Sequence, residues 1–378
     1  MTYTRRELLA GAAALASAPG SHAAAPPADP VALARCASYG KELLPTLHGM
    51  FDRLGGLGRI VKGKTVAVKL NLTGSPDYRL GHLPAELAHW THPAVIGAAV
   101  HLMGRAGARR IRLLESPWST AEPIEEYMID ASWEPRDLLS AAPRVEFENT
   151  NWLGNAKTYT RFKVPRPYIY PAFDLNHSYA DCDVFVTIAK MKEHFNAGIT
   201  LAMKNSFGIA PCTIYGDGAG ADEPTDVPRG GRGMFHGGRR QPPRSAPGEI
   251  VDAKAPRDGG YRVPRIVVDL VGARPIDLSI VDGIASMTHG EGPWIAGAKP
   301  VWPCVLLAGT NPVTTDAAGA AVMGFDPMAE RGRAPFEKCD STLKLAEDAG
   351  LGTRDLKRIE VRGAAIADVR FDFRKHHA

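Results

Sequence analysis

Alternating apolar and polar runs predict a strand–helix–strand unit early in the chain. Residues 64–70 form a short apolar stretch rich in β-branched side chains, which is typical of a buried strand. Residues 92–107 repeat apolar side chains at helical spacing, with Thr91 as N-cap and Gly107 as the stop signal. Residues 110–115 predict a second strand. Because a helix joins the two strands, we expect them to lie parallel in one sheet.

The same alternation continues toward the C-terminal part. Further strands are predicted at 183–189, 276–281, 303–308 and 356–361, and further helices at 199–207, 264–273 and 312–323. Residues 212–262 are rich in Gly, Pro, Arg and Asp with almost no apolar periodicity, which predicts a long loop insertion. The predicted fold class is therefore α/β, with a mostly parallel sheet flanked by helices. Two α/β lobes with a cleft between them are the alternative arrangement.

The first residues predict an export signal of the twin-arginine type. Arg5 and Arg6 precede a weakly apolar run at 8–18, and small residues then suit cleavage after Ala23 or Ala25. A short Ala-rich helix is the alternative. The paired arginines, the length of the apolar run and the small residues at the cleavage position all favour a signal peptide instead. We therefore expect the twin-arginine translocation machinery to deliver the protein to the periplasm or otherwise outside the cytoplasm. The expected organisation is a signal peptide at 1–25, a linker and helical lead-in at 26–63, an α/β domain at 64–330 and a C-terminal extension at 331–378.

Composition narrows the classes of partner. The 378 residues include 45 Lys plus Arg and 41 Asp plus Glu, and a net charge of +4 gives no support for a nucleic-acid partner. No other segment reaches the roughly 18 apolar residues of a membrane span, so the mature protein is expected to be soluble. None of the five cysteines is spaced as CxxC or CxC, so we expect neither a cysteine-ligated iron–sulfur cluster nor a zinc ribbon. Cys182 and Cys304 lie in apolar runs and are expected to be buried.

Polar side chains recur just after nearly every predicted strand. Open α/β sheets bind ligands at the carboxyl ends of their strands, so we expect these residues to meet in one pocket. They are Lys69, Asn71, Glu115, Ser116, Lys190, Lys192, His194, Lys204, Asn205, Asp282, His289, Glu291, Gly292, Thr310, Asn311 and Asp316. The period of two in Lys190, Lys192 and His194 would place all three side chains on one face of an extended chain.

These residue types suggest two kinds of chemistry. Converging lysines would hold a phosphate or carboxylate, and their lowered pKa values would let one act as a base or form a Schiff base. The candidate metal ligands are His194, Asp282, His289 and Glu291, because imidazole and carboxylate suit zinc, iron or nickel. For any single lysine the alternative is a solvent-facing side chain, and Asp316 could simply favour its own helix N-terminus. No GxxxxGK[ST] loop follows a strand and no GxGxxG opens a helix, so a nucleotide site is not predicted.

Several stretches of the chain resemble the DUF362 family, a bacterial and archaeal domain of unknown function. They are AVKLNLTG, THPAVIGAAVHLMGRAGARRIRLLESP, FVTIAKMKEHFNAGITLAMKNSFGIAP, LSIVDGIASMTHGEGP and GTNPVTTDAAGAAVMGFDP, in the family's order over residues 64–330. The resemblance implies that the family's recurrent positions fall on Lys69, Asn71, His92, Glu115, Lys190, Lys192, His194, Lys204, Asn205, Asp282, Gly292, Asn311 and Asp316. Some members carry a ferredoxin-like module with clustered cysteines, which this chain lacks. The insertion at 212–262 implies that the bound ligand is specific to the subgroup of the family to which this chain belongs.

The leading functional hypothesis is an exported enzyme. Lys190, Lys192 and Lys204 would bind an anionic or carboxylate-bearing ligand, while His194, Asp282 and Glu291 would supply acid–base groups or hold a divalent metal. Isomerisation, hydrolysis and redox chemistry are all compatible with these groups. The alternative is a non-catalytic protein that binds a metal, cofactor or anion, such as a maturation protein.

Overall fold

The structure is a computed structural model that describes residues 25–118, 120–151, 158–228, 230–250, 252 and 254–377. The paired arginines and the apolar run of the predicted signal peptide lie outside these residues, as does the predicted cleavage position Ala23. None of the described helices combines the length and apolar character needed to cross a membrane.

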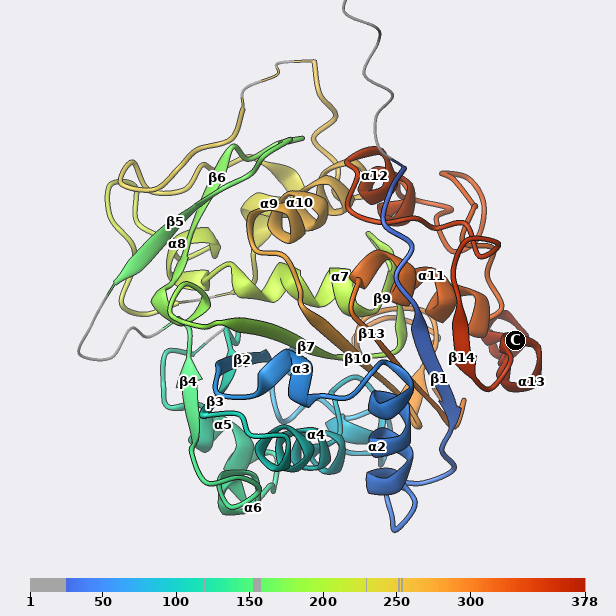
Figure 1. Cartoon of the computed structure of the whole chain (residues 1–378). Coiled ribbons are helices and arrows are strands. Elements are labelled where there is room, and N and C mark those ends of the chain that lie inside the picture. Colours follow the sequence, from blue (N-terminus) through green and yellow to red (C-terminus); the bar gives the residue numbers. More distant parts are fainter. Residues whose placement is uncertain are drawn as a thin grey trace, which may run out of the picture.

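One sheet of eight strands forms the centre of the molecule, in the order β14-β1-β13-β10-β7-β2-β3-β4 (Figure 1). The strands are β1 (Val31–Arg35), β2 (Thr65–Lys69), β3 (Arg110–Glu115), β4 (Val145–Asn149), β7 (Val184–Lys190), β10 (Leu278–Gly283), β13 (Val305–Gly309) and β14 (Val361–Gly363). This single sheet replaces the alternative of two separate lobes, and the predicted α/β class with a mostly parallel sheet is confirmed.

Strand β13 alone runs against the other strands of this sheet. It pairs antiparallel with β10 on one side and with β1 on the other, whereas β10, β7, β2, β3 and β4 pair in parallel. The last residue of β13, Gly309, lies opposite Ser279 near the start of β10. The carboxyl end of β13 is therefore at the edge of the sheet where the parallel strands begin.

Helices cover both faces of the sheet, and each face has its own apolar core (Figure 1). One layer contains α2 (Leu43–Arg53), α3 (Gly58–Val61), α4 (Pro93–Arg105), α5 (Ile124–Asp130) and α6 (Pro135–Leu139). The other contains α7 (Ala202–Asn205), α8 (Cys212–Tyr215), α9 (Gly233–Gly237), α10 (Gly259–Ala273), α11 (Pro312–Val322) and α12 (Thr342–Asp348). The pleat divides each strand between the two cores: Val186 and Ile188 of β7 face the α2–α4 layer, and Phe185 faces the other.

Smaller elements complete the chain. Three two-stranded pairs are β5 (Tyr159–Lys163) with β6 (Ala172–Asn176), β8 (Lys192–His194) with β9 (Gly198–Thr200), and β11 (Ser286–Met287) with β12 (Pro300–Val301). Short helical turns are η1 (Ala85–Leu87), η2 (His177–Tyr179), η3 (Ser206–Ile209), α13 (Ile366–Val369) and η4 (Phe373–His376). The β8–β9 pair and η3 are the parts of this set that shape the candidate site.

The strands predicted near 64–70, 110–115, 183–189, 276–281 and 303–308 are confirmed to within two residues at each end. The predicted cap of α4 is wrong, because the His92 imidazole, not Thr91, accepts the N–H of Ala94. The helix predicted at 199–207 is a strand end followed by α7 and η3, and α10 begins before Pro264, which lies inside it. The last strand is at Val361–Gly363, five residues later than the predicted start at 356.

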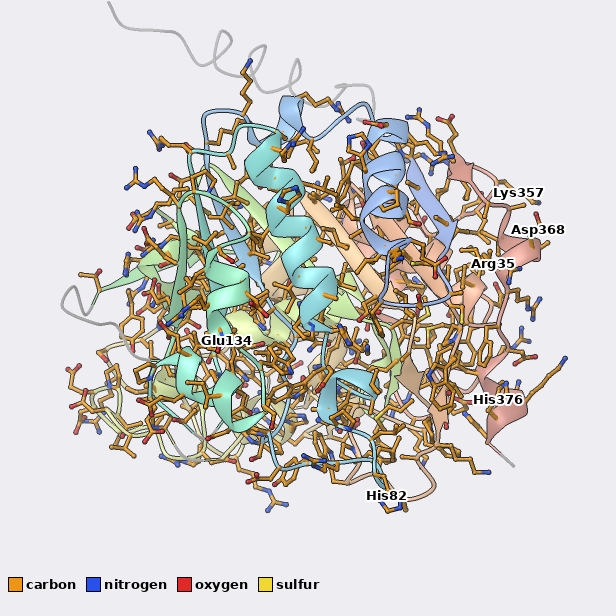
Figure 2. The ribbon with its side chains drawn as sticks, turned by 90° about the horizontal axis from the view of Figure 1, so that it is seen from below. Arg35, His82, Glu134, Lys357, Asp368 and His376 are labelled. Atoms are coloured by element: carbon orange, nitrogen blue, oxygen red, sulfur yellow. The ribbon has the colours of Figure 1, made fainter. Side chains whose placement is uncertain are left out.

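The two segments flanking the predicted domain belong to the same sheet. The lead-in at 26–63 supplies β1, which was not predicted, and the extension at 331–378 supplies β14, which pairs with it. At this edge a guanidinium nitrogen of Arg35 donates to the backbone oxygen of Asp368 (Figure 2). The predicted loop at 212–262 contains α8, α9 and the start of α10. All five cysteines are free, and Cys182 and Cys304 are half-buried instead of buried.

Candidate functional site

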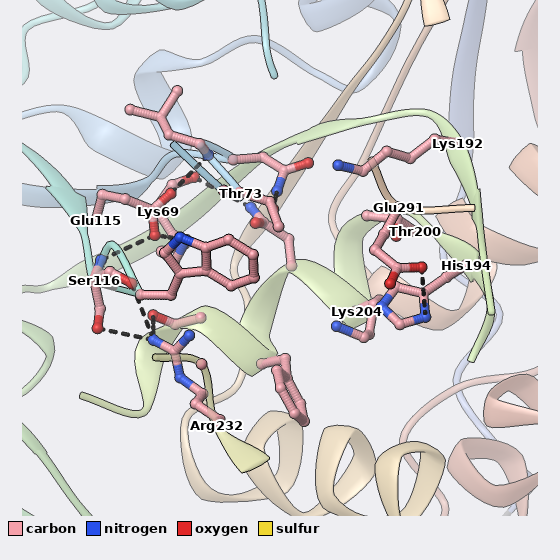
Figure 3. Close-up of a pocket in the computed structure, with 18 of the residues that line it drawn as sticks. Lys69, Thr73, Glu115, Ser116, Lys192, His194, Thr200, Lys204, Arg232 and Glu291 are labelled. Carbon is pink, nitrogen blue, oxygen red and sulfur yellow. Dashed lines mark hydrogen bonds and ion pairs between the residues drawn. The ribbon is translucent and has the colours of Figure 1, made fainter. Parts of the chain in front are cut away.

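A cavity of about 290 Å³ opens at the carboxyl edge of the parallel strands. Its walls come from residues that end or follow β2, β3, β7 and β10, and from the insertion at 212–262. Figure 3 shows two groups of side chains across this space: Lys69, Glu115, Ser116 and Arg232 on one side, and Lys192, Lys204, His194 and Glu291 on the other. We call this cavity the cationic pocket.

The first group contains a charge pair that is already complete. The ammonium of Lys69 forms a buried ion pair with Oε1 of Glu115 and donates to the backbone oxygen of Leu70 at 2.6 Å. Oε2 of Glu115 accepts the N–H of Leu72 at 2.8 Å. Lys69 and Glu115 therefore line the pocket as predicted, but they satisfy each other.

Arg232 extends from the insertion into the same side of the pocket. Its Nε donates to the backbone oxygen of Ala210 at 2.6 Å and its Nη2 donates to Oγ of Ser116 at 2.8 Å. Among the described residues no carboxylate forms an ion pair with this guanidinium, although only 8% of Arg232 is exposed. Its positive charge is therefore available to a ligand, although the carboxylates of Glu115 and Asp217 line the same cavity.

Lys192 and Lys204 are the two ammonium groups on the other side. Nζ of Lys192 donates to the backbone oxygen of His89 at 2.6 Å, and Nζ of Lys204 lies 4.1 Å from the ring centroid of Phe207. Neither forms an ion pair within the described part of the chain. Burial lowers the pKa of Lys192 and that of Lys204 to about 7, partly offset in each case by the carboxylate of Glu291. Both lysines can thus gain or lose a proton near neutral pH.

His194 and Glu291 form a weakly coupled pair beside these lysines. Nδ1 of His194 lies 3.8 Å from Oε2 of Glu291 and accepts the N–H of Asn196 at 3.1 Å, which places the proton of a neutral imidazole on Nε2. Burial and the ammonium of Lys204 lower the pKa of His194 well below its usual value. Burial opposes ionisation of Glu291, but the adjacent imidazole and the N–H of Phe195 outweigh it and hold the pKa at about 2.

Asp316 acts on the pocket from a distance. Its two carboxylate oxygens accept the N–H groups of Ala202 and Met203 at 2.8 and 2.9 Å, at the start of the short helix that carries Lys204. Burial raises the pKa of Asp316 to about 7 despite these bonds. Asp316 is therefore a positioning residue for α7 and not a ligand-facing group. It belongs to α11, but its carboxylate caps α7.

Two more predicted ligand residues hold the edges of the pocket. Nδ2 of Asn205 donates to Oγ1 of Thr187 at 2.8 Å, and Oδ1 of Asn71 accepts the N–H of Lys190 at 3.2 Å. Both residues line the cavity. Their amides are largely used in joining neighbouring strands, so they shape the pocket more than they offer free donors.

Lys190 and Asp282 were predicted in the pocket, and the structure places both elsewhere. Nζ of Lys190 lies 2.9 Å from Oδ2 of Asp282 on the sheet face covered by α2 and α4. Asp282 also accepts the hydroxyl of Tyr39 and the N–H of His92, each at 3.0 Å. The chain bends after β7, so the period of two does not carry Lys190 to the side of Lys192 and His194. We call the Lys190–Asp282–Tyr39 group the closed cluster.

Three other predicted positions also lie outside the lining. Asn311 follows the antiparallel strand β13, so it is at the opposite edge, where its side chain caps α11 by accepting the N–H of Val313 at 2.9 Å. The His289 ring packs 4.1 Å from that of His377. Gly292 packs against Trp294, with no room for a side chain. Of the predicted metal set only His194 and Glu291 come together, and no group of three potential ligands forms among the described residues.

Sequence reasoning missed several residues of the pocket. Arg232, His236 and Asp217 come from the insertion, and Trp118 and Trp294 come from the loops after β3 and β10. The glycine-rich context of Arg232 gave no periodic signal. Two tryptophans shortly after predicted strands were a usable signal, because exposed aromatic residues in such loops often contact ligands.

These features define an α/β protein with a cationic pocket at the carboxyl edge of its parallel strands. The sequence profile described as "Domain of unknown function (DUF362)" matches residues 66–321. The chain belongs to this family, which confirms the resemblance noted from its sequence motifs.

The individual relatives and solved structures that match the chain are distant from it in sequence. A stretch of 183 residues is 26% identical to the thylakoid-associated protein sll1697 of Synechocystis sp., covering 48% of this chain and 50% of that protein. The chain thus spans about half the length of this curated relative. Among solved structures, the lactate racemase apoprotein of Thermoanaerobacterium thermosaccharolyticum is 8% identical with a TM-score of 0.34, covering 72% of this chain and 54% of the other. A protein from Thermotoga maritima is 14% identical with a TM-score of 0.31, and the match covers 66% of this chain and 53% of that protein. Both structural likenesses are too slight to support any statement about activity.

Proposed function

We propose that the cationic pocket binds a small organic anion and exchanges a proton with it, which would make this protein an enzyme. The observation that carries the proposal is the meeting of Lys192, Lys204 and Arg232 in one cavity, where none of the three forms an ion pair with a described residue. Buried charges in proteins are ordinarily paired. A ligand carboxylate or phosphate would supply the missing negative charge.

The two lysines differ in how firmly they are held. Lys192 is fixed by its hydrogen bond to His89 and suits an anchoring role, together with the guanidinium of Arg232. Among the described residues the ammonium of Lys204 has no hydrogen-bond or ion-pair partner and lies over the ring of Phe207, so it is freer to reach a reacting atom. A group with a pKa near 7 is the most effective proton acceptor and donor at neutral pH.

The proposed step is the removal of a proton from a carbon next to the ligand's acid or carbonyl group. Nζ of neutral Lys204 takes the proton, and the electron pair of the C–H bond stays on the ligand as an enolate. Lys192 and Arg232 stabilise the added negative charge, and Nε2–H of His194 is a further donor. Return of the proton to the carbon completes an isomerisation or exchange without any other reactant.

A non-catalytic binding protein is the second candidate. The observation that favours it is the pKa of about 2 for Glu291, together with the low pKa of His194. Both groups are weak bases at neutral pH, so only the lysines are suited to proton transfer. A pocket that merely retains an anion needs no such group.

The experiment begins with a thermal-shift screen of carboxylates and phosphates, followed by calorimetry on each hit. Each bound compound is then incubated in heavy water, and incorporation of deuterium is followed by NMR. The enzyme proposal predicts exchange that is lost in Lys204→Met, while Lys357→Met, which removes an exposed lysine, exchanges normally. Binding without exchange would favour the binding protein, and a failure of every acid to bind would refute both.

We also propose export by the twin-arginine route, on the sequence evidence of Arg5 and Arg6, the apolar run at 8–18 and the small residues that suit cleavage after Ala23 or Ala25. Replacement of both arginines by lysine should retain the protein in the cytoplasm, measured by fractionation. Equal export of this variant would refute the proposal. Elemental analysis of the exported protein would show whether a divalent metal joins His194 and Glu291.

A further inference from the structure

One wall of the cationic pocket is built from aromatic side chains that come from three separate segments. Trp118 follows β3, Trp294 follows β10, and Tyr78 lies in the loop after β2. The ring centroids of Trp118 and Trp294 are 5.4 Å apart, and Tyr78 meets them edge-on at 6.0 and 5.4 Å. Both tryptophans line the cavity, and Trp294 is still 39% exposed. Apolar ring surface is thus left open to solvent beside cations that form no ion pair with a described residue.

The backbone around this wall is shaped to admit the rings. A Cβ on Gly292 would lie 2.2 Å from the indole of Trp294, and one on Gly74 would lie 2.8 Å from it. Gly74 also has a φ of +89°, which side-chain-bearing residues rarely adopt. A Cβ on Gly231 would lie 3.4 Å from the ring of Trp118, next to Arg232. Close approach at Gly292 and Gly74 fixes the indole of Trp294 in place, and ordinary contact at Gly231 packs Trp118 beside it, which favours a built surface over loosely exposed side chains.

We infer that the ligand is an acid that carries both a planar aromatic ring and the exchangeable C–H group, with its acidic group on the lysines and its ring on the tryptophan wall. This inference rests on the proposed function, since it needs the same pocket to bind an anion. Aromatic rings stack favourably on indole faces, and a flat ring covers more of an open indole than a saturated one does. A cavity of about 290 Å³ suits a ligand of one or two rings.

The alternative occupant is an aliphatic acid that uses only the cations. In that case the aromatic wall would contribute general apolar contact, and a saturated ring of the same size and charge would bind equally well. The two readings therefore differ in a single measurable quantity, which is the affinity ratio between an aromatic acid and its saturated counterpart.

The experiment measures this ratio by calorimetry on the full chain with three matched pairs. The pairs are benzoate and cyclohexanecarboxylate, isophthalate and its saturated dicarboxylate, and phenyl phosphate and cyclohexyl phosphate. The first two pairs test a carboxylate and the third a phosphate. We expect the aromatic member of at least one pair to bind about three- to tenfold more tightly.

Substitution of the wall tests the cause of that preference. Trp118→Leu should reduce the ratio to near one, Trp118→Phe should preserve most of it, and Trp302→Leu, at an exposed site outside the pocket, should leave it unchanged. Circular dichroism of each variant checks that the fold is kept. Equal affinity within every pair that binds, or a ratio that survives Trp118→Leu in a folded protein, overturns the inference while leaving anion binding intact. If no member of any pair binds and inorganic phosphate does not bind either, the result refutes anion binding by the pocket, and with it both the proposed function and this inference.

Discussion

Lys190 and Lys192 are two residues apart and both are completely buried, yet they have opposite environments. In the closed cluster, Lys190 has a carboxylate at 2.9 Å, a tyrosine hydroxyl at 3.1 Å and a backbone oxygen at 2.9 Å. In the cationic pocket, Lys192 has one backbone oxygen and an open cavity. Removing one partner of a paired buried ammonium destabilises a fold, whereas an ammonium without an ion-pair partner has a stability cost that a ligand can offset. The difference separates structural from functional lysines in this chain.

The largest expected effect comes from opening the closed cluster. Asp282→Ala leaves the ammonium of Lys190 and the N–H of His92 buried without their acceptor, so the free energy of unfolding should fall by about 3–5 kcal/mol. Urea denaturation measures this change. The double variant Lys190→Met, Asp282→Leu should recover most of the loss, because it removes both charges. An Asp282→Ala protein as stable as the original would show that the closed cluster is not structural.

The equivalent change in the cationic pocket should act in the opposite direction. Lys192→Met removes a buried charge that has no carboxylate partner, so the free energy of unfolding should stay constant or rise by up to about 2 kcal/mol. The same denaturation assay compares it directly with Asp282→Ala. Destabilisation of similar size in both variants would erase the distinction between the two lysines.

The pH dependence of stability offers a smaller test of the same distinction. The pKa of Lys204 is about 7 in the folded protein, below the usual lysine value of 10.5, so the unfolded chain binds more protons between these values. The contribution of Lys204 to the free energy of unfolding should therefore become more favourable as pH rises from about 7 toward 10.5. Comparison with Lys204→Met isolates this contribution, and identical slopes in the two proteins would argue against a lowered pKa of Lys204 in the folded protein.

The smallest effect is expected at Asn311, which was predicted from the sequence to lie in the site but which the structure places at the opposite edge of the sheet. Asn311→Ala removes the cap of α11, which should cost about 1 kcal/mol of stability without changing the affinity for any acid. A matched loss of acid affinity would mean that Asn311 contributes to the pocket after all.

The strands were predictable because their signal is local. Buried parallel strands appear as continuous apolar runs, as at Val184–Lys190, and these need no knowledge of their neighbours. The direction of a strand within its sheet has no such local signal in the sequence. Nothing in the run at Val305–Gly309 indicates that it pairs antiparallel with β10, and this one reversal moved Asn311 to the other edge of the sheet.

The site was predictable only where residues directly follow a parallel strand. Lys69, Glu115, Lys192, His194 and Glu291 meet as expected. Which face a side chain takes at a strand end depends on the bend that follows, so Lys190 could not be separated from Lys192 by spacing. Arg232 comes from an insertion whose path is set by tertiary contacts, such as its bonds to Ala210 and Ser116, and these leave no periodic pattern.

The most direct measurement is calorimetric titration with the tightest-binding acid of the carboxylate and phosphate series. It compares the original chain with the double variant Lys192→Met, Lys204→Met, and with Lys357→Met as the control for loss of one exposed positive charge. We predict that the double variant stays folded and binds roughly 100-fold more weakly, since each lost charged hydrogen bond is worth about 1.5–3 kcal/mol, while the control is unchanged. A folded double variant that binds the acid as tightly as the original chain would contradict the assignment of these two lysines to the binding site.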